Sequence, residues 1–163
     1  MHTGNVVAAW ATAVHDRLRA TMLELGLESR DLSALTLIAE HDGCTGDWLR
    51  TRVDLTQSGT VRLVDRLVSR RLVRRSHAGG RAVPLHVTED GAAVLAAWAR
   101  RRDDVVDDLL AAVPAAHRGE VVGGMAAALQ GRERPRAEAD TTCRRCTWAA
   151  CGDDCPVDRS VTG

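Results

Sequence analysis

The chain of 163 residues contains no lysine, phenylalanine or tyrosine, and it has a single isoleucine, Ile38, and a single asparagine, Asn5. Alanine, arginine, valine and glycine are abundant in their place, a usage typical of a GC-rich coding sequence that carries no information about the fold. Because all 22 residues counted as lysine or arginine are arginines, the missing lysine does not exclude contacts with phosphate groups.

Long apolar runs are missing too, since no stretch approaches the roughly 18 residues that a membrane-spanning helix needs. The start of the chain lacks the basic-then-apolar pattern of a signal segment, so we expect a cytoplasmic protein with no membrane partner. No arrangement of Ser, His and Asp residues indicates a catalytic centre, and we expect no enzyme activity. The length fits one compact domain with a tail.

An excess of one charge sign is absent from the chain as a whole, with 22 basic and 22 acidic residues, but it is present locally. Nine arginines lie between positions 50 and 81, against the two acids Asp54 and Asp65. Surfaces that are merely solvated usually mix both signs, as the rest of this chain does. A basic patch attracts the phosphate backbone and releases its counterions, so the pattern predicts binding to double-stranded DNA with a steep dependence on salt.

The segment from residue 56 to residue 71 has the pattern of an amphipathic helix within this patch. Thr56 is suited to cap its first turn, and Val61, Val64, Leu67 and Val68 recur at helical spacing as the predicted buried stripe. The polar side chains then face outward, where they are able to bind phosphates and base edges. The predicted DNA-binding residues of this helix are Thr56, Gln57, Ser58, Thr60, Arg62 and Arg66.

Two short strands are predicted directly after this helix, over residues 72–75 and 83–87. The turn between them contains Gly79 and Gly80 and carries Arg81 near its tip. A helix of a size that enters the major groove therefore lies beside a basic hairpin of a size that enters the minor groove. The predicted fold class is mainly α with a small β-wing, and Arg81 is the predicted minor-groove residue.

Residues 32–95 closely resemble the winged helix-turn-helix core of MarR-type transcriptional regulators. The resemblance implies that the predicted helix is the recognition helix, that Arg81 enters the minor groove, and that Thr88 begins the long helix after the wing. It rests on the runs 58–67, 71–75, 80–83 and 87–91.

The sequence departs from the family pattern at two positions. Arg71 stands where a glycine usually ends the recognition helix, so we expect a different geometry at this exit. Gly80 replaces a charged residue before the wing arginine, which predicts a more flexible tip.

Amphipathic helices are predicted on both sides of this core. Residues 6–25 carry an apolar stripe, Asp31 is suited to cap a second helix, and residues 47–53 form the first helix of the helix-turn-helix, with Trp48 in the core. After the wing, the long helix is followed by another that begins at Pro114.

The first and last of these helices carry apolar stripes that a single winged domain does not cover. Pairing two chains through them buries the stripes and places two recognition helices in successive major grooves, about ten base pairs apart. We therefore expect a homodimer that binds a palindromic operator as a repressor, with a small-molecule effector as a further partner. The predicted division is 1–28 for an N-terminal dimerisation helix, 29–90 for the winged domain, 91–131 for C-terminal dimerisation helices, and 132–163 for a linker and cysteine-rich tail.

The tail is the part that MarR-type chains normally lack. After a polar linker it places four thiols within thirteen residues, and a cytosolic location argues against a standing disulfide framework. We expect these thiols to hold an iron–sulfur cluster that makes the regulator responsive to redox or iron status, with Trp148, Arg144, Arg145 and Arg159 shielding or balancing it. A structural zinc ion and a metal-free redox switch or inert tail are the alternatives. The predicted metal ligands are Cys143, Cys146, Cys151 and Cys155.

Two other classes of function remain open from the sequence. In one, the winged fold contacts protein without reading DNA, and a four-cysteine zinc tail serves metal handling. In the other, Cys143 and Cys146 act as the dithiol of a small redox enzyme, although the strand–helix context of thioredoxin-like folds is missing. The fifth thiol, Cys44, is expected to be a small buried residue.

Overall fold

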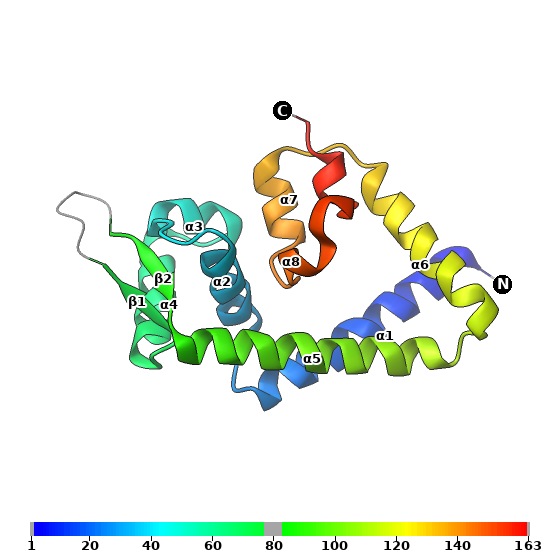
Figure 1. Cartoon of the computed structure of the whole chain (residues 1–163), viewed down its shortest axis with the longest axis horizontal. Helices are drawn as coiled ribbons and strands as arrows, with labels where there is room; N and C mark the ends of the chain where they lie inside the picture. The colour runs from blue at the N-terminus through cyan, green and yellow to red at the C-terminus, as the bar shows by residue number, and fades with distance from the viewer. Residues whose placement is uncertain (1, 77–82, 163) are drawn as a thin grey trace.

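The computed structural model describes residues 2–76 and 83–162 and is mainly helical with a two-stranded antiparallel wing, as predicted. The winged end and the tail lie side by side along one flank of the long helix α5, with α1 against its far half (Figure 1). The elements are α1 (Thr3–Glu24), α2 (Ser29–Glu40), α3 (Gly46–Arg52), α4 (Gln57–Ser69), β1 (Val73–Arg75), β2 (Leu85–Val87), α5 (Glu89–Ala111), α6 (Ala115–Gln130), α7 (Arg136–Thr142), α8 (Trp148–Cys151), and the short 3-10 helices η1 (Gly152–Asp154) and η2 (Asp158–Ser160). Among the described helices, none has the length and apolarity to cross a membrane.

The core forms around α2, in which every residue from Asp31 to Ile38 is buried. Burial of a helix on all sides requires neighbours on all sides, and α3, α4, the wing and α5 supply them. The fully buried large side chains are Met22, Leu27, Leu32, Leu35, Leu37, Ile38, Leu49, Leu63, Leu67, Val73 and Trp98.

Helix starts follow the capping signals in the sequence in two of three places. Thr56 caps α4 by accepting the N–H of Gly59 at 3.1 Å, and Thr88 caps α5 by accepting the N–H of Gly91 at 3.1 Å, both as predicted. The prediction for α2 was wrong by one turn, because Glu28 is its N-cap and Asp31 lies three residues later in a reciprocal capping box.

The departure at Arg71 does not change the exit from α4. Arg71 takes the left-handed conformation, with φ of 60°, that the family's glycine would take. The N–H of Leu72 then reaches the carbonyl of Leu67 at 3.0 Å and closes the helix end. The prediction of a different geometry was therefore wrong. The left-handed conformation costs the arginine about 1 kcal/mol in steric strain, and the helix still ends without a different turn.

The wing is tied at its base to the turn between α2 and α3. Val73 pairs with Val87 and Arg75 pairs with Leu85 in the antiparallel register. Leu85 also donates its N–H to the carbonyl of Cys44 and accepts the N–H of Gly43, each at 2.9 Å. The wing base, α3 and α4 are thus joined by backbone hydrogen bonds and core packing into one unit.

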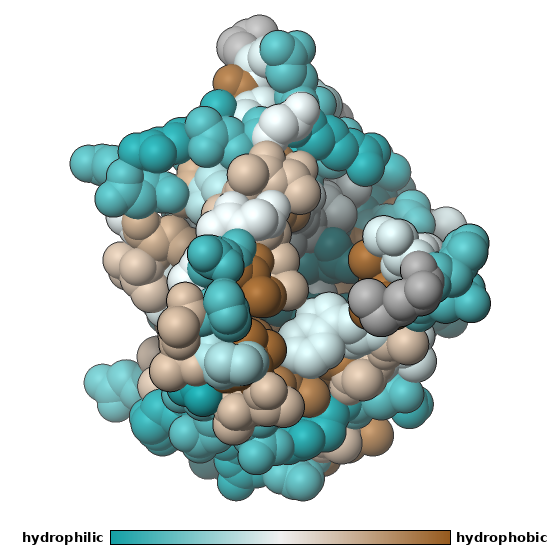
Figure 2. All heavy atoms as spheres, turned by 90° about the vertical axis from the view of Figure 1, so that its right-hand side faces the viewer, coloured by the Kyte–Doolittle hydropathy of each residue, from teal (hydrophilic) through white to brown (hydrophobic). Residues whose placement is uncertain are grey.

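The far end of the molecule exposes apolar side chains on α1 and α6. In α6 no residue is buried, and Val122 and Met125 are exposed. Figure 2, which views this end, shows hydrophobic side chains gathered in the middle of the face and hydrophilic ones around its rim. Such a patch is typical of a protein–protein interface. On α1 the exposed apolar residues are Val6, Val7 and Leu23.

The tail is a folded unit, and the prediction of a polar linker before the cysteines was wrong. Residues 136–142 of that segment form α7, which packs against α3. The two ends of the tail meet where Arg134 donates its N–H to Ser160 at 3.0 Å and accepts the N–H of Thr162 at 3.1 Å. The tail is therefore a closed loop docked on the winged core.

Candidate functional site

The exposed face of α4 differs by two positions from the predicted one. Gln57, Ser58 and Arg62 are exposed, as predicted, and together with Thr56 and Val61 they line a shallow surface depression. Thr60 is only 3% exposed, while Val61, predicted to be buried, is 50% exposed. The buried stripe of α4 is instead Thr60, Leu63, Val64 and Leu67.

Thr60 is buried without an energetic penalty because its hydroxyl is satisfied within the helix. Its Oγ1 donates to the carbonyl of Thr56 at 3.0 Å, which leaves the methyl group free to pack on the core. The side chain is therefore turned away from any ligand on the outer face of α4. The prediction that Thr60 faces outward was wrong.

Arg66 lies on the surface but is directed toward α2. Its Nε and Nη2 donate to the same oxygen of Asp31, at 3.0 and 2.5 Å, and Asp31 is almost fully buried. Arg70 lies 3.8 Å from the other oxygen of this carboxylate. Both arginines thus compensate a buried charge, which makes Arg66 a weaker candidate for DNA contact than its position on α4 suggested.

Ion pairs divide the basic patch into engaged and available arginines. Five of its arginines pair with acids, whereas Arg62, Arg71 and Arg74 have no ion pair among the described residues. The positive surface open to an external phosphate is therefore smaller than the sequence count indicated. Arg81, the predicted minor-groove residue, lies outside the described residues. The engaged pairs are Arg50 with Asp47, Arg52 with Asp140, Arg66 and Arg70 with Asp31, and Arg75 with Asp65.

The four tail cysteines line one cavity of about 200 Å³, which we call the cysteine hollow. Cys143, at the end of α7, is buried, whereas Cys146 and Cys151 are exposed and Cys155 is half-buried. That these thiols surround a common metal centre stays a prediction, because lining one cavity does not by itself bring the four sulfurs to metal-binding distance. The other walls of the hollow are Arg136, Ala139, Asp140, Trp148, Gly152, Val157 and Asp158.

The thiols influence one another electrostatically. A hydrogen bond with Cys146, followed by burial, raises the pKa of Cys143 far above its ordinary value. The same hydrogen bond lowers the pKa of Cys146 to about 7, and the nearby Arg102 guanidinium acts in the same direction. Burial raises the pKa of Cys151. Of this hydrogen-bonded pair, Cys146 is therefore the thiol that more readily supplies a thiolate near neutral pH.

The hollow is not shaped for a single metal ion. Over residues 2–76 and 83–162, no three or more His, Cys, Asp or Glu side chains are grouped so that they would hold one ion. To bind a metal ion or cluster, these thiols would have to lie closer together than they do in this structure.

Several polar residues noted in the sequence have structural partners. The Asp42 carboxylate accepts a hydrogen bond from Nδ1 of His86 at 2.8 Å, which joins the turn after α2 to the wing. Trp48 is half-buried, with its ring 4.4 Å from that of His41 and the Arg52 guanidinium 3.9 Å above it. The sequence placed Trp48 in the core but gave no indication that it lies at a contact with the tail.

Cys44 is half-buried and packs against the main core, close to the sequence prediction of a small buried residue. Burial raises its pKa to about 11, so it remains a thiol at neutral pH.

Comparisons with known proteins agree on the winged region. Residues 25–82 match the family model described as MarR family. A search of curated proteins finds no matching relative. Among solved structures, MepR, a transcription regulator of the Staphylococcus aureus multidrug efflux pump MepA, is 12% identical over 80% of this chain and 98% of its own length, with a TM-score of 0.71.

Two further structures hold ligands. A mutant of S. aureus MepR bound to an oligodeoxyribonucleotide is 14% identical over 80% of this chain and 98% of that chain, with a TM-score of 0.66. The Mycobacterium tuberculosis MarR family protein Rv2887 in complex with salicylic acid is 17% identical over 77% of this chain and 94% of that chain, with a TM-score of 0.59. At these identities the likeness establishes the shared fold, and it extends well beyond the matched residues 25–82.

Proposed function

Because this chain belongs to the MarR family of winged helix-turn-helix DNA-binding transcriptional regulators, we propose that it is a repressor that binds a palindromic operator as a homodimer. The observation that carries the proposal is the outer face of α4, where the exposed Gln57, Ser58 and Arg62 line an open depression beside the wing. Amide, hydroxyl and guanidinium groups are the donors that read base edges and phosphates.

Dimerisation is supported by the apolar face at the other end of the molecule. The exposed residues of α6, with Val6 and Val7 of α1, have no covering element among the described residues. A second copy that covers this face by two-fold symmetry would present two α4 helices to successive major grooves. In this fold the N- and C-terminal helices typically form the dimer interface.

A small-molecule effector is a further proposed partner, since the M. tuberculosis relative holds salicylic acid. A cavity of about 450 Å³ between α3, α4 and the wing offers space for such a ligand. Its lining includes the exposed amide of Gln57 and the guanidinium groups of Arg50 and Arg75. An organic anion would bind there by replacing the ion pairs of these arginines with Asp47 and Asp65. Binding there would compete with or reposition the DNA-reading side chains.

Replacing Arg62 by alanine is expected to weaken operator binding by about 1 to 3 kcal/mol, because this guanidinium is exposed on α4 and has no acidic partner among the described residues. Duplexes selected from a random library serve as the probe, and titration at several salt concentrations gives both affinity and salt slope. Arg100→Ala, on the exposed surface of α5, is the control and should leave the affinity unchanged. Equal affinities for the Arg62→Ala variant and the parent chain would contradict the proposed DNA face.

For the tail, we propose that the four cysteines hold an iron–sulfur cluster whose gain and loss adjust operator occupancy. The support is that four thiols line one hollow and that the Arg102 guanidinium lies near Cys146, where it would balance the charge of an anionic cluster. Binding the cluster would draw the four thiols closer together than they lie in this structure. Such a group would give the regulator sensitivity to iron supply or oxidants. The chain's own part is to supply the sulfurs and to shield them with Trp148.

Anaerobic incubation of the full chain with iron and sulfide is expected to give about four iron atoms per chain and a broad absorption band near 400 nm, since cluster chromophores absorb in that region. Cys151→Ser should lower the iron content, whereas Cys44→Ser, outside the hollow, should not. A colourless chain that instead purifies with one zinc ion would favour the structural zinc alternative, and a chain that holds neither metal would favour a metal-free tail.

A further inference from the structure

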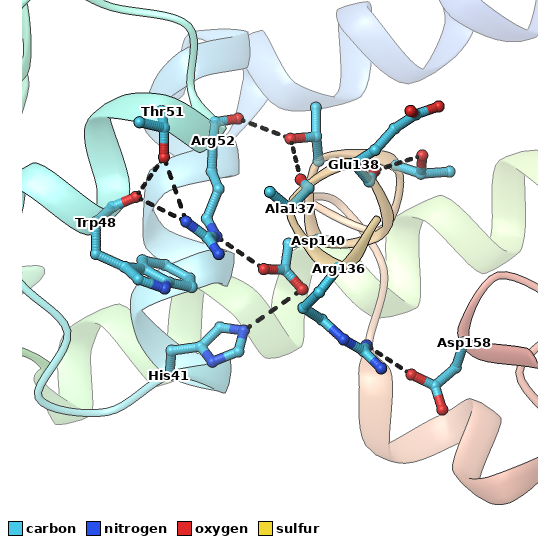
Figure 3. Close-up of polar contacts among 11 residues, drawn as sticks. His41, Trp48, Thr51, Arg52, Arg136, Ala137, Glu138, Asp140 and Asp158 are labelled. Carbon is cyan, nitrogen blue, oxygen red and sulfur yellow. Dashed lines mark hydrogen bonds and ion pairs between the residues drawn. The ribbon is translucent and has the colours of Figure 1, made fainter. Parts of the chain in front are cut away.

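The tail meets the helix-turn-helix through a nearly solvent-free ion pair. Asp140 of α7 is 1% exposed, and its Oδ2 accepts a hydrogen bond from Nε of Arg52 at 2.7 Å. Arg52 is the last residue of α3, and its guanidinium also lies over the Trp48 ring (Figure 3). A buried carboxylate is costly unless it is paired, so this contact fixes the position of α7 relative to α3.

The same side chains form the wall of the cysteine hollow. Asp140 lies one turn before Cys143 on α7, and both residues line the hollow. Trp148 also lines the hollow and contacts α2. Its backbone N–H donates to the Glu40 carboxylate at 3.2 Å, and its ring stands edge-on to that of His41 with the centroids 5.1 Å apart. Any group that fills or leaves the hollow therefore acts on residues that also touch α2 and α3.

Only one of the two carboxylate oxygens of Asp140 has a hydrogen-bond partner among the described residues. Its Oδ1 lies 3.9 Å from Nε2 of His41, and both atoms are buried without a hydrogen-bond partner in the described structure (Figure 3). A shift of about 1 Å would bring them within hydrogen-bonding distance, typically 2.7 to 3.2 Å. Unpaired buried polar atoms are costly, so a small movement of α7 that closes this hydrogen bond would be favourable.

We propose that Asp140 is a positioning residue that couples the occupancy of the cysteine hollow to α3, and through α3 to the recognition helix. This inference rests on the metal response proposed above. The path is short: Cys143 and Asp140 share α7, Asp140 holds Arg52, and α3 packs directly on α4 through the buried Leu49. A small displacement of α3 therefore changes the angle at which α4 meets its groove.

The test compares amide hydrogen exchange of α3 in the full-length chain before and after anaerobic reconstitution with iron and sulfide. In the parent chain, exchange over residues 46–52 is expected to change by about tenfold or more on reconstitution. Asp140→Asn keeps the size of the side chain but removes its charge, and it should abolish that change while the iron content stays the same. If Asp140 had only a structural role, Asp140→Asn would change the exchange rates of α3 both before and after reconstitution. The change in those rates caused by reconstitution would then remain.

Asp158→Asn is the matched control, because Asp158 also lines the hollow and pairs with Arg136 at 2.6 Å, but this pair is exposed and lies within the tail. It should preserve the response of α3. Arg52→Gln breaks the same buried pair from the α3 side, so it should reproduce the Asp140→Asn result and serves if that variant does not fold.

Operator affinity provides the second measurement. Reconstitution is expected to change the Kd of the parent chain by about tenfold, and that of Asp140→Asn by less than about twofold. The coupling would be overturned if exchange in α3 did not change in the iron-loaded parent chain, or if it still changed in Asp140→Asn. Either result would leave the proposed cysteine site intact. If the parent chain takes up no iron, the proposed metal response itself is wrong, and the coupling falls with it.

Discussion

Replacing Trp98 by alanine is expected to destabilise the folded chain by about 3 to 5 kcal/mol, the range for removing a large aromatic side chain from a core. Trp98 of α5 is 2% exposed and belongs to the main core. Its Nε1 also donates to the carbonyl of Arg145 at 3.0 Å, so it ties the tail to the long helix as well. Urea denaturation followed by circular dichroism measures the loss.

Trp98→Phe is the matched control, because it retains most of the buried ring and removes only the donor to Arg145. Its cost should be about 1 to 2 kcal/mol, that of losing a buried hydrogen bond with some change of volume. A loss below about 1 kcal/mol for Trp98→Ala would show that α5 does not pack as described. Exposed tail amides should also exchange faster in both variants, since the Arg145 carbonyl loses its shorter hydrogen bond and keeps only the one from Arg102 at 3.5 Å.

Adding one methyl group at Gly91 is expected to cost about 2 to 3 kcal/mol, the upper range for overpacking a core. Gly91 is buried in the first turn of α5, where its Cα faces the carbonyl of Leu72. A Cβ built there would clash with that carbonyl oxygen and lie 2.8 Å from Cγ1 of Val87. The backbone at Leu72 cannot move aside as a flexible side chain can, so the wing and α5 would have to move apart.

The control for Gly91→Ala is Gly119→Ala. Gly119 lies in α6 with open space around its Cα within one chain, so alanine there should stabilise the helix by up to about 1 kcal/mol when measured at a protein concentration too low for the proposed pairing through α6. Thermal denaturation of both variants at one protein concentration separates the two effects. A Gly91→Ala chain as stable as the parent would contradict the close approach of α5 to the wing.

The winged region could be predicted from the sequence because its signals are local. Thr56 and Thr88 precede their helices as caps, and each short strand begins with a buried apolar residue, Val73 or Leu85. The error on α4 came from counting Thr60 as polar. Its hydroxyl bonds within its own helix, so the buried stripe shifts by one residue and Val61 is exposed.

The errors on Arg66 and on the tail have a different cause, since both depend on partners far away in the sequence. Arg66 pairs with Asp31, 35 residues earlier, and no local pattern reveals this. The segment before the cysteines is polar, yet its Asp140 is buried because Arg52 of α3 compensates its charge. Only the gathering of the four cysteines was visible in their spacing, and the group they hold remains a prediction.

The distance along the chain between the tail and its docking residues also sets an order of assembly. The hydrogen bonds that Asp140 accepts and that Trp148 and Arg145 donate join residues 88, 108 and 116 positions apart, whereas the winged core closes through much shorter loops. Contacts of high sequence separation form late, and a growing chain emerges from its N-terminus. In a newly made chain the recognition helix α4 is therefore expected to fold before the tail docks on α2 and α3, so any influence of the cysteines on α3 is the last to be established.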